Sequence, residues 1–357
     1  MLIAVTGGTG FLGAHTVAAL LRRGHRVRLL ARDASGVDAS TVDVVAGDVT
    51  DPAAARRLVA GADALLHAAG VYTFDSRRRD ELWRVNVRGT EVVLGAARRA
   101  GTGRIVHVST VGALYPATAP SIGVSSPVGE SREPYLASKA AAERIARQHR
   151  AAGAPVVLTY PPALLGPRDP RLGDQNARLR DLLRGLTPIW PGGGLPIGDV
   201  RDSAELHARL LGGEVHGAAF FGPGRFLTTR EYLATARAAT GRALPAVFLP
   251  PRALYPVGRF ADRLQRVWPW ALPVQYGAIH VCASAVPVAG DAPTGGVPAR
   301  PVLETVRDTV AWLHATGRVT GRRAGAAVPP VPSTSDSGRP ALTGPGPGTG
   351  QTEEVLS

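Results

Sequence analysis

The sequence contains a single cysteine, few aromatic residues and no long apolar run. Because Cys282 stands alone, it cannot close a disulfide within the chain, and no group of cysteines and histidines has the spacing of a zinc site. No stretch reaches the roughly 18 continuous apolar residues of a membrane-spanning helix. The first five residues lead directly into a glycine-rich loop, without the basic and then apolar order of a signal peptide. We therefore expect a cytoplasmic protein with no metal site and no membrane span.

The chain carries a formal net charge of +13, but its basic residues do not gather in one place. Lysine occurs once, at Lys139, among 41 lysines and arginines. Most arginine pairs lie near the ends of expected helices, where cations complement the helix dipole. The one longer run, residues 77–79, is typical of a solvated loop. A strongly basic chain suggests phosphate binding, yet this scattered distribution leads us to expect no nucleic-acid partner.

The first 160 residues alternate short apolar runs with helical patterns, which is typical of βαβ units around a parallel sheet. Such a doubly wound sheet binds its ligand at the carboxyl ends of the strands, where the strand order reverses. The expected strands are Leu2–Thr6, Arg26–Ala31, 42–46, 64–68, 104–109 and Val156–Tyr160, and the expected helices are 11–23, Pro52–Val59, 80–100 and 134–152.

Beyond Pro161, proline and glycine interrupt shorter helical patterns at 176–184, 203–211, 229–240 and 302–315. From residue 320 the sequence has almost no large apolar side chain and cannot repay the entropy of ordering. The sequence thus predicts an α/β protein in three parts. These are a dinucleotide-binding doubly wound parallel sheet in residues 1–165, a smaller substrate-binding lobe with late sheet elements in 166–319, and a disordered tail in 320–357.

Residues 6–13, with the sequence TGGTGFLG, follow the first expected strand and open the first expected helix. Glycines at such a junction allow a tight turn and a close approach of the backbone to a pyrophosphate, and the helix N-terminus offers unpaired N–H groups. Strand, loop and helix together are the context that a Rossmann dinucleotide site requires. We therefore expect a dinucleotide cofactor at Gly7, Gly10 and Gly13.

The end of the second expected strand favours NADP(H) over NAD(H). An NAD enzyme normally has an acidic residue there for the ribose hydroxyls, and an NADP enzyme has an arginine for the 2′-phosphate. Here Ala31 takes the position of the acid and Arg32 follows. Asp33 keeps NAD(H) as the alternative, because its carboxylate can bind the ribose hydroxyls instead. After the third strand, Asp48 is a candidate acceptor for the adenine amino group, with helix capping as the alternative.

Tyr135 and Lys139 are spaced four residues apart, so both lie on one face of an expected helix. An ammonium group beside a phenol favours the phenolate and lowers its pKa toward neutrality, which makes tyrosine a usable proton donor or acceptor. The chain uses arginine at every other basic position. Retention of a lysine here indicates a need for a compact ammonium that a planar guanidinium does not replace.

Two hydroxyls and one amide are the further candidates for this site. Ser109 and Thr110 follow the fifth expected strand, where either hydroxyl can bind a substrate oxygen or cap the local backbone. Asn86 lies early in a long expected helix, where asparagine is a poor helix former, so we expect a buried amide that holds a water or a bend. His67 and His107 fall on expected strands and are interpreted as packed rather than catalytic.

An ordered set of motifs makes residues 1–316 resemble the extended short-chain dehydrogenase/reductases, also called the NAD-dependent epimerase/dehydratase family. The glycine loop, the Tyr135–Lys139 pair and the segment 161–169 carry much of this resemblance. Within the family, the chain is most similar to the dihydroflavonol reductase-like and 3β-hydroxysteroid dehydrogenase-like branch. The other matching motifs are 47–49 (GDV), 67–70 (HAAG), 86–90 (NVRGT), 108–110 (VST), 199–204 (DVRDSA), 300–305 (RPVLET) and 310–313 (VAWL).

The resemblance implies a role for each matching position. Tyr135 would be the general acid/base, Lys139 would hold the nicotinamide ribose, Thr110 or Ser109 would orient the substrate carbonyl, and Asn86 would support the helix of the catalytic pair. A homodimer through the helices 80–100 and 134–152 is also implied. The cofactor would be held by Gly7, Thr9, Gly10, Phe11, Leu12, Gly13, Arg32, Asp48, Val49, Ala68, Ala69, Gly70, Tyr135, Lys139, Pro161, Pro162, Ala163 and Leu164.

The sequence also departs from parts of the family. In the sugar dehydratase branch an acidic pair follows the active-site threonine, whereas Val111 and Gly112 follow Thr110 here, so dehydration is disfavoured. Tyr160 stands where relatives often have arginine or asparagine. Residues 283–297 match the family poorly, which leaves the substrate undetermined.

We interpret the protein as an NADP(H)-dependent oxidoreductase that interconverts a carbonyl and a secondary alcohol on a small, apolar substrate. Trp268, Trp270, Tyr276 and the stretch 250–255 are candidates for an apolar pocket, with ordinary packing as the alternative. A nucleotide-sugar epimerase with tightly bound NAD is the second hypothesis, against which Ala31 and Arg32 argue. A non-catalytic dinucleotide-sensing module is the third, against which the intact Tyr135 and Lys139 argue.

Overall fold

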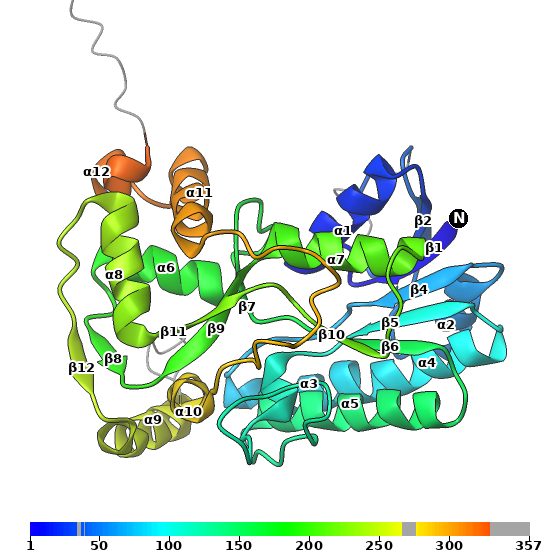
Figure 1. The fold of residues 1–357 in the computed structure, drawn as a ribbon, viewed down its shortest axis with the longest axis horizontal. Helices are drawn as coiled ribbons and strands as arrows, with labels where there is room; N and C mark the ends of the chain where they lie inside the picture. The colour runs from blue at the N-terminus through cyan, green and yellow to red at the C-terminus, as the bar shows by residue number, and fades with distance from the viewer. Residues whose placement is uncertain (34–36, 39, 266–275, 329–357) are drawn as a thin grey trace, which may run out of the picture.

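The computed structural model describes residues 1–33, 37–38, 40–265 and 276–328 (Figure 1). Its main element is a seven-stranded parallel sheet with the order β10-β6-β5-β4-β1-β2-β3. The chain runs outward from β1 to β3 and then returns to β4 on the other side of β1, so the strand order reverses between β1 and β4. The strands are β1 (Leu2–Thr6), β2 (Arg26–Ala31), β3 (Asp43–Ala46), β4 (Ala64–His67), β5 (Arg104–Val108), β6 (Val156–Tyr160) and β10 (Ala219–Phe221).

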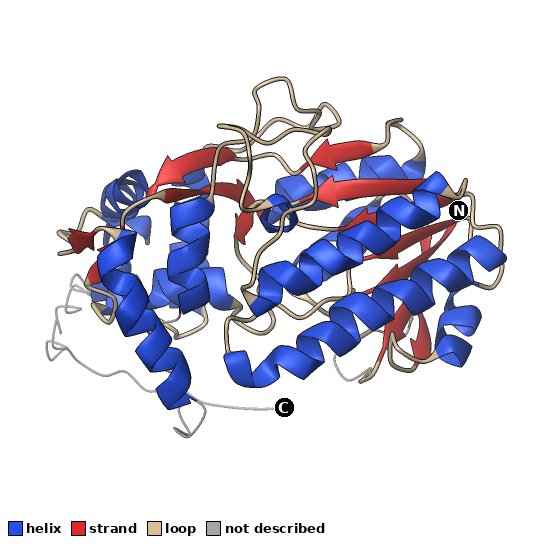
Figure 2. Cartoon of the chain, turned by 90° about the horizontal axis from the view of Figure 1, so that it is seen from below, coloured by secondary structure: helices blue, strands red, loops and turns tan. Residues whose placement is uncertain are grey.

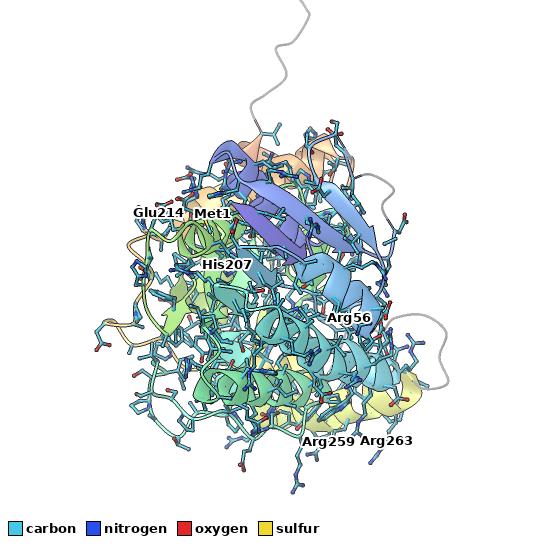
Figure 3. The ribbon with its side chains drawn as sticks, turned by 90° about the vertical axis from the view of Figure 1, so that its right-hand side faces the viewer. Met1, Arg56, His207, Glu214, Arg259 and Arg263 are labelled. Carbon is cyan, nitrogen blue, oxygen red and sulfur yellow. The ribbon has the colours of Figure 1, made fainter. Side chains whose placement is uncertain are left out.

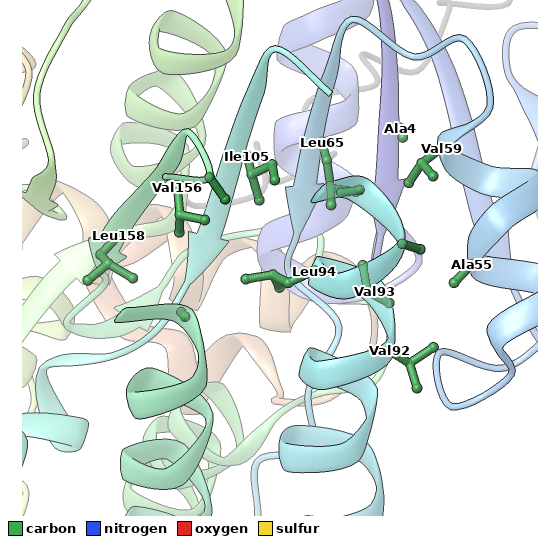
Figure 4. Close-up of a cluster of buried hydrophobic side chains, with 14 of the residues drawn as sticks. Ala4, Ala55, Val59, Leu65, Val92, Val93, Leu94, Ile105, Val156 and Leu158 are labelled. Carbon is green, nitrogen blue, oxygen red and sulfur yellow. The ribbon is translucent and has the colours of Figure 1, made fainter. Parts of the chain in front are cut away.

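Helices cover both faces of this sheet, as expected for a doubly wound fold (Figure 1). On one face, α1 (Phe11–Arg22) packs against α7 (Val200–Gly212). On the other face lie α2 (Pro52–Val59), α4 (Gly89–Arg99) and α5 (Pro134–Ala151), and Figure 2 shows two long helices of this layer side by side. The apolar side chains between α2, α4 and the sheet are largely Ala, Val, Leu and Ile (Figure 4), so this part of the core is aliphatic rather than aromatic.

The region expected to be one helix, 80–100, is instead built from several helical pieces. A 3₁₀ turn (Ser76–Arg78) and the short α3 (Arg79–Leu82) lead into a π-helical turn (Trp83–Arg88), and only then does α4 begin. The π turn carries Asn86, and such turns occur often at functional sites. The expectation that the Asn86 amide is buried is confirmed, whereas the expectation of one continuous helix through it was wrong.

The later residues form a lobe beside the sheet, and they also supply β10 and α7 to the sheet layers. The lobe contains a sheet of β7 (Ala163–Leu165), β9 (Gly194–Asp199) and β11 (Arg225–Thr228), and a pair β8 (Ile189–Pro191) and β12 (Val247–Leu249). Its helices are α6 (Asp174–Arg184), α8 (Thr229–Thr240), α9 (Pro251–Gln265), α10 (Tyr276–Ser284) and α11 (Val302–Ala315). The sequence did not predict α9 and α10, because Pro256 lies inside α9 and proline disfavours a helix interior.

The C-terminal tail begins later than expected. Residues 320–327 were expected to be disordered, but they form the short α12 (Gly321–Ala324) and a 3₁₀ turn (Gly325–Ala327). The physical reason is that Ala324 is fully buried in the lobe core, where a small side chain suffices. Residues 329–357 of the expected tail lie outside the described residues. In the described ranges, no helix is long and apolar enough to cross a membrane.

Candidate active site

The glycine loop between β1 and α1 lies at the point where the strand order reverses. Gly7 has a φ of 75°, and a Cβ atom there would come within 2.5 Å of the Ala69 amide nitrogen. At Gly13 a Cβ atom would collide with the Gly7 carbonyl. No side chain caps the N-terminus of α1. Backbone without side chains and an uncapped helix N-terminus fit a pyrophosphate, so the loop is suited to a dinucleotide.

The loop that follows β4 lies close to this glycine loop, and the loop that follows β3 packs against the start of α4. Ala68 and Ala69 approach Gly7, and the Ala69 N–H donates to the Thr6 hydroxyl at 3.2 Å. Gly70 lies near the Asn86 amide, and Val49 packs against Gly89 at the start of α4. These positions of 47–49 and 68–70 therefore lie along the carboxyl edge of the sheet, as the parallel topology requires.

Asp48 stands between two arginines at the end of β3. Its Oδ1 accepts hydrogen bonds from the Thr50 backbone at 3.0 Å and the Thr50 hydroxyl at 2.7 Å. Arg84 Nη1 lies 3.4 Å from Oδ1, and the mostly exposed Arg32 has its Nη1 4.0 Å from Oδ2. Burial acts to raise the pKa of Asp48, but the Thr50 hydrogen bonds and the two arginines outweigh it and lower the pKa.

Tyr135 and Lys139 lie on the inner face of α5, with only 8% and 9% of their surfaces exposed. Pro134 occupies the first turn of this helix, and the Glu133 carboxylate caps it by accepting from the Leu136 N–H at 2.8 Å. The Lys139 ammonium donates to the Val108 carbonyl at the end of β5, at 2.9 Å. This hydrogen bond joins α5 to the sheet directly beneath the candidate site.

Burial has the largest effect on the pKa of both Tyr135 and Lys139. It raises the pKa of Tyr135, whose ring packs edge-on against Tyr72, and it lowers the pKa of Lys139 to about 8, opposed by the charge of Glu143. The expectation that Lys139 lowers the pKa of Tyr135 is thus wrong for the protein alone. The ammonium is held on the Val108 carbonyl, and the phenol is surrounded by aromatic rings.

Two hydroxyls follow β5 beside Tyr135. The Thr110 and Tyr135 side chains share a hydrogen bond, and the Thr110 hydroxyl also accepts from the Gly112 N–H at 3.2 Å. Ser109 is buried, and its hydroxyl has no partner among the described residues. An unsatisfied hydroxyl beside a phenol is suited to hydrogen-bond an oxygen atom of a ligand. The interpretation of Thr110 as a backbone cap is confirmed, and its role as a site group stays a prediction.

Asn86 joins the π-helical turn to two other segments. Its Nδ2 donates to the Val71 carbonyl and to the Ser138 hydroxyl, each at 3.0 Å, and its Oδ1 accepts from the Val71 N–H at 2.7 Å. Ser138 lies between Tyr135 and Lys139 on α5. The amide therefore positions the catalytic helix against the loop after β4, and it does not itself line the cavity described next.

A cavity of about 310 Å³ opens at the carboxyl edge of the sheet, between the sheet and the lobe. Phe74, Tyr115, Leu195 and Val281 contribute to its apolar walls, and Ser109, Thr110 and Tyr135 also line it. Phe11, Leu12 and Pro161, Pro162, Ala163 and Leu164 also line it. The polar residues elsewhere in its lining are Tyr72, Asp169, Asp174, Gln175 and Asn176.

A family model described as the NAD dependent epimerase/dehydratase family matches residues 3–218, which cover the glycine loop, the Tyr135–Lys139 pair and most of the cavity lining. The chain belongs to the NAD-dependent epimerase/dehydratase family. Members of this family bind a nicotinamide dinucleotide, and the relatives below are named as reductases and dehydrogenases. The sequence-based family assignment, the doubly wound fold and the enzyme class are confirmed.

Three relatives show which branch of the family this chain resembles. Sterol demethylase protein B of Methylococcus capsulatus is 30% identical over 280 residues, 74% of this chain and 83% of that protein. The 2-alkyl-3-oxoalkanoate reductase of Stenotrophomonas maltophilia is 32% identical over 75% of this chain and 84% of its own. The 3β-hydroxysteroid dehydrogenase/Δ5→4-isomerase of Mycobacterium tuberculosis is 38% identical over 30% of this chain and 31% of its own.

Two solved structures have a fold similar to that of this chain. The crystal structure of gox2253 has a TM-score of 0.75 and 28% identity, and the match covers 90% of this chain and 99% of that one. UDP-glucose 4-epimerase from Bifidobacterium longum in complex with NAD⁺ and UDP has a TM-score of 0.68 at 19% identity, covering 89% of this chain and 99% of that one. The second match supports the fold of the family only.

The aromatic wall of the cavity differs from the one expected. Trp268 and Trp270 lie outside the described residues, and Tyr276 stacks on His280 instead of lining the cavity. Tyr72 and Phe74, in the loop after β4, pack around Tyr135 in their place. Tyr72 lies in a loop, Asp174 and Gln175 begin α6, and Arg84 lies in the π-helical turn. Their nearness to the site depends on tertiary packing, so sequence reasoning missed all four.

The two strand histidines are packed, as expected. His67 shares hydrogen bonds with Thr6 and Thr90 at 2.8 and 3.1 Å, and burial lowers its pKa to about 3. His107 stacks on His67, and burial lowers its pKa as well. Both rings are therefore neutral at physiological pH. Within the described residues, no group of three or more His, Cys, Asp or Glu side chains is arranged to hold a metal ion.

Proposed function

We propose that the protein is an NADP(H)-dependent oxidoreductase that interconverts a carbonyl and a secondary alcohol on a small, apolar substrate. The observation that carries this proposal is the cavity, a largely apolar space whose lining includes the hydroxyl groups of Tyr135, Thr110 and Ser109. A carbonyl oxygen needs a proton donor and hydrogen-bond donors, whereas the rest of an apolar ketone needs only apolar contact.

The charges around the cavity favour this substrate class over a nucleotide sugar. Among the described lining residues, none is Arg, Lys or His, and two are the carboxylates Asp169 and Asp174. A diphosphate requires cationic or N–H donors, and carboxylates repel it. Burial also raises the pKa of Asp174, as expected for a group in an apolar setting. The names of three relatives refer to sterol, steroid and alkyl-oxoalkanoate chemistry, which supports the same proposal.

The cofactor is assigned to the carboxyl edge of the sheet. The loop of Gly7 to Gly13 would hold the pyrophosphate, and Lys139 would hold the nicotinamide ribose. Arg32 would bind the 2′-phosphate, with Arg84 as a second cation beside it, because both lie next to Asp48 at the end of β3. The absence of an acid at Ala31 removes the usual partner of the NAD ribose.

A bound nicotinamide supplies the hydride for reduction and accepts it in oxidation. Tyr135 gives its phenolic proton to the substrate oxygen in reduction and takes it back in oxidation. Thr110, already hydrogen-bonded to Tyr135, and the unpartnered Ser109 stabilise the developing charge on that oxygen. Asn86 and Glu133 keep α5 in place while Tyr135 cycles between its two protonation states.

The cofactor preference is tested by titrating the purified protein with NADPH and with NADH, followed by fluorescence. We expect tighter binding of NADPH in the wild type and loss of this preference in Arg32→Ala. Arg57→Ala, an exposed arginine on α2, is the matched control and keeps the preference. Tighter NADH binding, or a cofactor that stays bound through purification, would contradict the NADP reductase and favour the epimerase.

Two further expectations remain proposals. A non-catalytic sensor would keep its biological effect in Tyr135→Phe, whereas an oxidoreductase would lose it.

The cytoplasmic location and a homodimer through α4 and α5 are expected from the sequence and its resemblance to the family. Analytical ultracentrifugation of the wild type checks the dimer directly.

A further inference from the structure

The outward side of α9 carries apolar and cationic side chains in separate stripes. Val257 and Phe260 are 51% and 66% exposed and lie three residues apart, so together they form a small apolar patch on the helix. Arg252, Arg259 and Arg263 are exposed beside them. We call these five residues the α9 face. Figure 3 shows Arg259 and Arg263 at the lower edge of the molecule, pointing away from it.

The spacing of these residues separates the two kinds of side chain. Arg252, Arg259 and Arg263 are seven and four residues apart, so they form one stripe along the helix. Val257 and Phe260 are three apart and form the neighbouring stripe. The opposite side of the helix is buried through Leu254, Gly258, Ala261 and Gln265.

The negative charge of α9 lies away from this face. Asp262 is the helix's one carboxylate, and its charge acts on the buried Glu133 at the start of α5. A cationic stripe next to an exposed apolar stripe is the pattern of a helix that lies in the plane of a lipid surface. The phosphates of anionic lipids complement the arginines, and the acyl chains complement Val257 and Phe260.

The α9 face is one helix away from the candidate active site. Helix α9 packs on α10, and close approach is possible because a Cβ atom at Gly258 would come within 3.0 Å of Ile279 Cδ1. On its other side, α10 places Ala278 and Val281 against the cluster that contains Tyr135, and Val281 lines the cavity. The stripes therefore lie on the outer side of the wall that encloses the apolar cavity.

We propose that the α9 face docks the protein reversibly on an anionic lipid surface. The arginines bind lipid phosphates, and Val257 and Phe260 enter the boundary between headgroups and acyl chains. Docking would bring the apolar cavity next to the medium in which apolar substrates dissolve. This proposal goes beyond the oxidoreductase function, and its test measures binding without any substrate.

The test is co-sedimentation of the full chain with vesicles of phosphatidylcholine, with and without phosphatidylglycerol. We expect the wild type to bind the anionic vesicles and to dissociate at high salt. An arginine near an anionic surface contributes roughly fivefold to partitioning, so Arg252→Gln with Arg259→Gln and Arg263→Gln should weaken binding roughly a hundredfold. Val257→Ser with Phe260→Ser should also abolish binding. All five positions are exposed, and melting temperature verifies that both variants fold.

The matched control removes three arginines from other faces. Arg22→Gln with Arg56→Gln and Arg98→Gln changes the net charge equally on α1, α2 and α4, and Figure 1 shows α2 at the opposite side of the molecule from α9. We expect this control to bind like the wild type. An equal loss of binding in the control would overturn the proposal, because overall charge would then explain it.

Three other results would overturn the proposal as well. One is the absence of wild-type binding to anionic vesicles. Another is full binding by the Val257→Ser and Phe260→Ser variant, which would make the arginines a site for polyanions of any kind. The third is a wild-type dimer that this variant dissociates, which would identify the α9 face as an interface between two copies of the chain.

Discussion

The Lys139 ammonium group is buried, and burial disfavours its charged form. Burial lowers its pKa from 10.5 to about 8, a shift that corresponds to about 3 kcal/mol between the folded and unfolded states. Between these two values the unfolded chain binds more protons than the folded chain, so stability rises with pH in this window. The buried ammonium therefore lowers the stability of the fold near neutral pH.

Replacement of Lys139 by methionine tests this cost. At pH 7 we expect Lys139→Met to melt at a higher temperature than the wild type and to lose cofactor binding. The difference in melting temperature should shrink as the pH rises from about 8 toward 10.5, because the wild-type lysine then becomes neutral in both states. A difference that does not change with pH would show that the lysine is not destabilised by burial.

The two hydroxyls after β5 should contribute unequally to turnover. Thr110→Val removes the hydrogen-bond partner of Tyr135 and should lower kcat about 100-fold, the usual effect of losing one donor to a developing oxyanion. Ser109→Ala removes a hydroxyl that has no partner among the described residues, so it should raise KM more than it lowers kcat. Steady-state kinetics on one ketone measures both. A larger fall of kcat in Ser109→Ala than in Thr110→Val would contradict this prediction and would show that Ser109 orients the carbonyl.

At the scale of elements, strands could be predicted from the sequence better than the walls of the site. Every strand expected in the first 160 residues is present within one or two residues, because buried parallel strands are continuous apolar runs. Tyr135 and Lys139 could be placed on one helix face from spacing alone. Tyr72 and Asp174 could not be assigned to the site, since their positions depend on how the loop after β4 and helix α6 pack in three dimensions.

The N-terminus of α5 offers a test of how an element supports the site. Burial raises the pKa of its cap, Glu133, from 4.5 to about 7. Between these values the folded chain binds more protons than the unfolded chain, so the stability contributed by this group falls as pH rises. Glu133→Gln keeps an acceptor for the Leu136 N–H without the charge. We expect this variant to melt at a higher temperature than the wild type above pH 7, with the difference vanishing near pH 4.5.

Glu130→Gln is a suitable control for that measurement. It removes an exposed carboxylate three residues before Glu133 and leaves the Glu133 carboxyl group in place. Its difference from the wild type should therefore be the same at all of these pH values. If the melting temperatures of Glu133→Gln and the wild type differed by the same amount at every pH, the Glu133 carboxylate would not be destabilised in the folded state.

At the scale of the whole molecule, residues 320–327 complete the core of the lobe, although composition alone assigns them to a disordered tail. Ala324 is fully buried, and Arg242 donates to the Arg323 carbonyl at 2.9 Å. A chain that ends at residue 328 keeps these contacts, and one that ends at residue 319 loses them. We expect the shorter chain to be less stable by about 2 kcal/mol, a fall of roughly 4–8 °C in melting temperature. Equal melting temperatures would show that α12 adds nothing to the lobe.

The most direct test of the proposed function follows hydride from the cofactor to the substrate. The full chain is incubated with NADPH deuterated at C4 of the nicotinamide and with a panel of alicyclic and aromatic ketones. We predict deuterium on the carbinol carbon of at least one product, and a loss of about 100-fold or more in Tyr135→Phe with NADPH binding unchanged. Epimerisation of a nucleotide sugar without net consumption of NADPH, or equal turnover in Tyr135→Phe, would contradict this function.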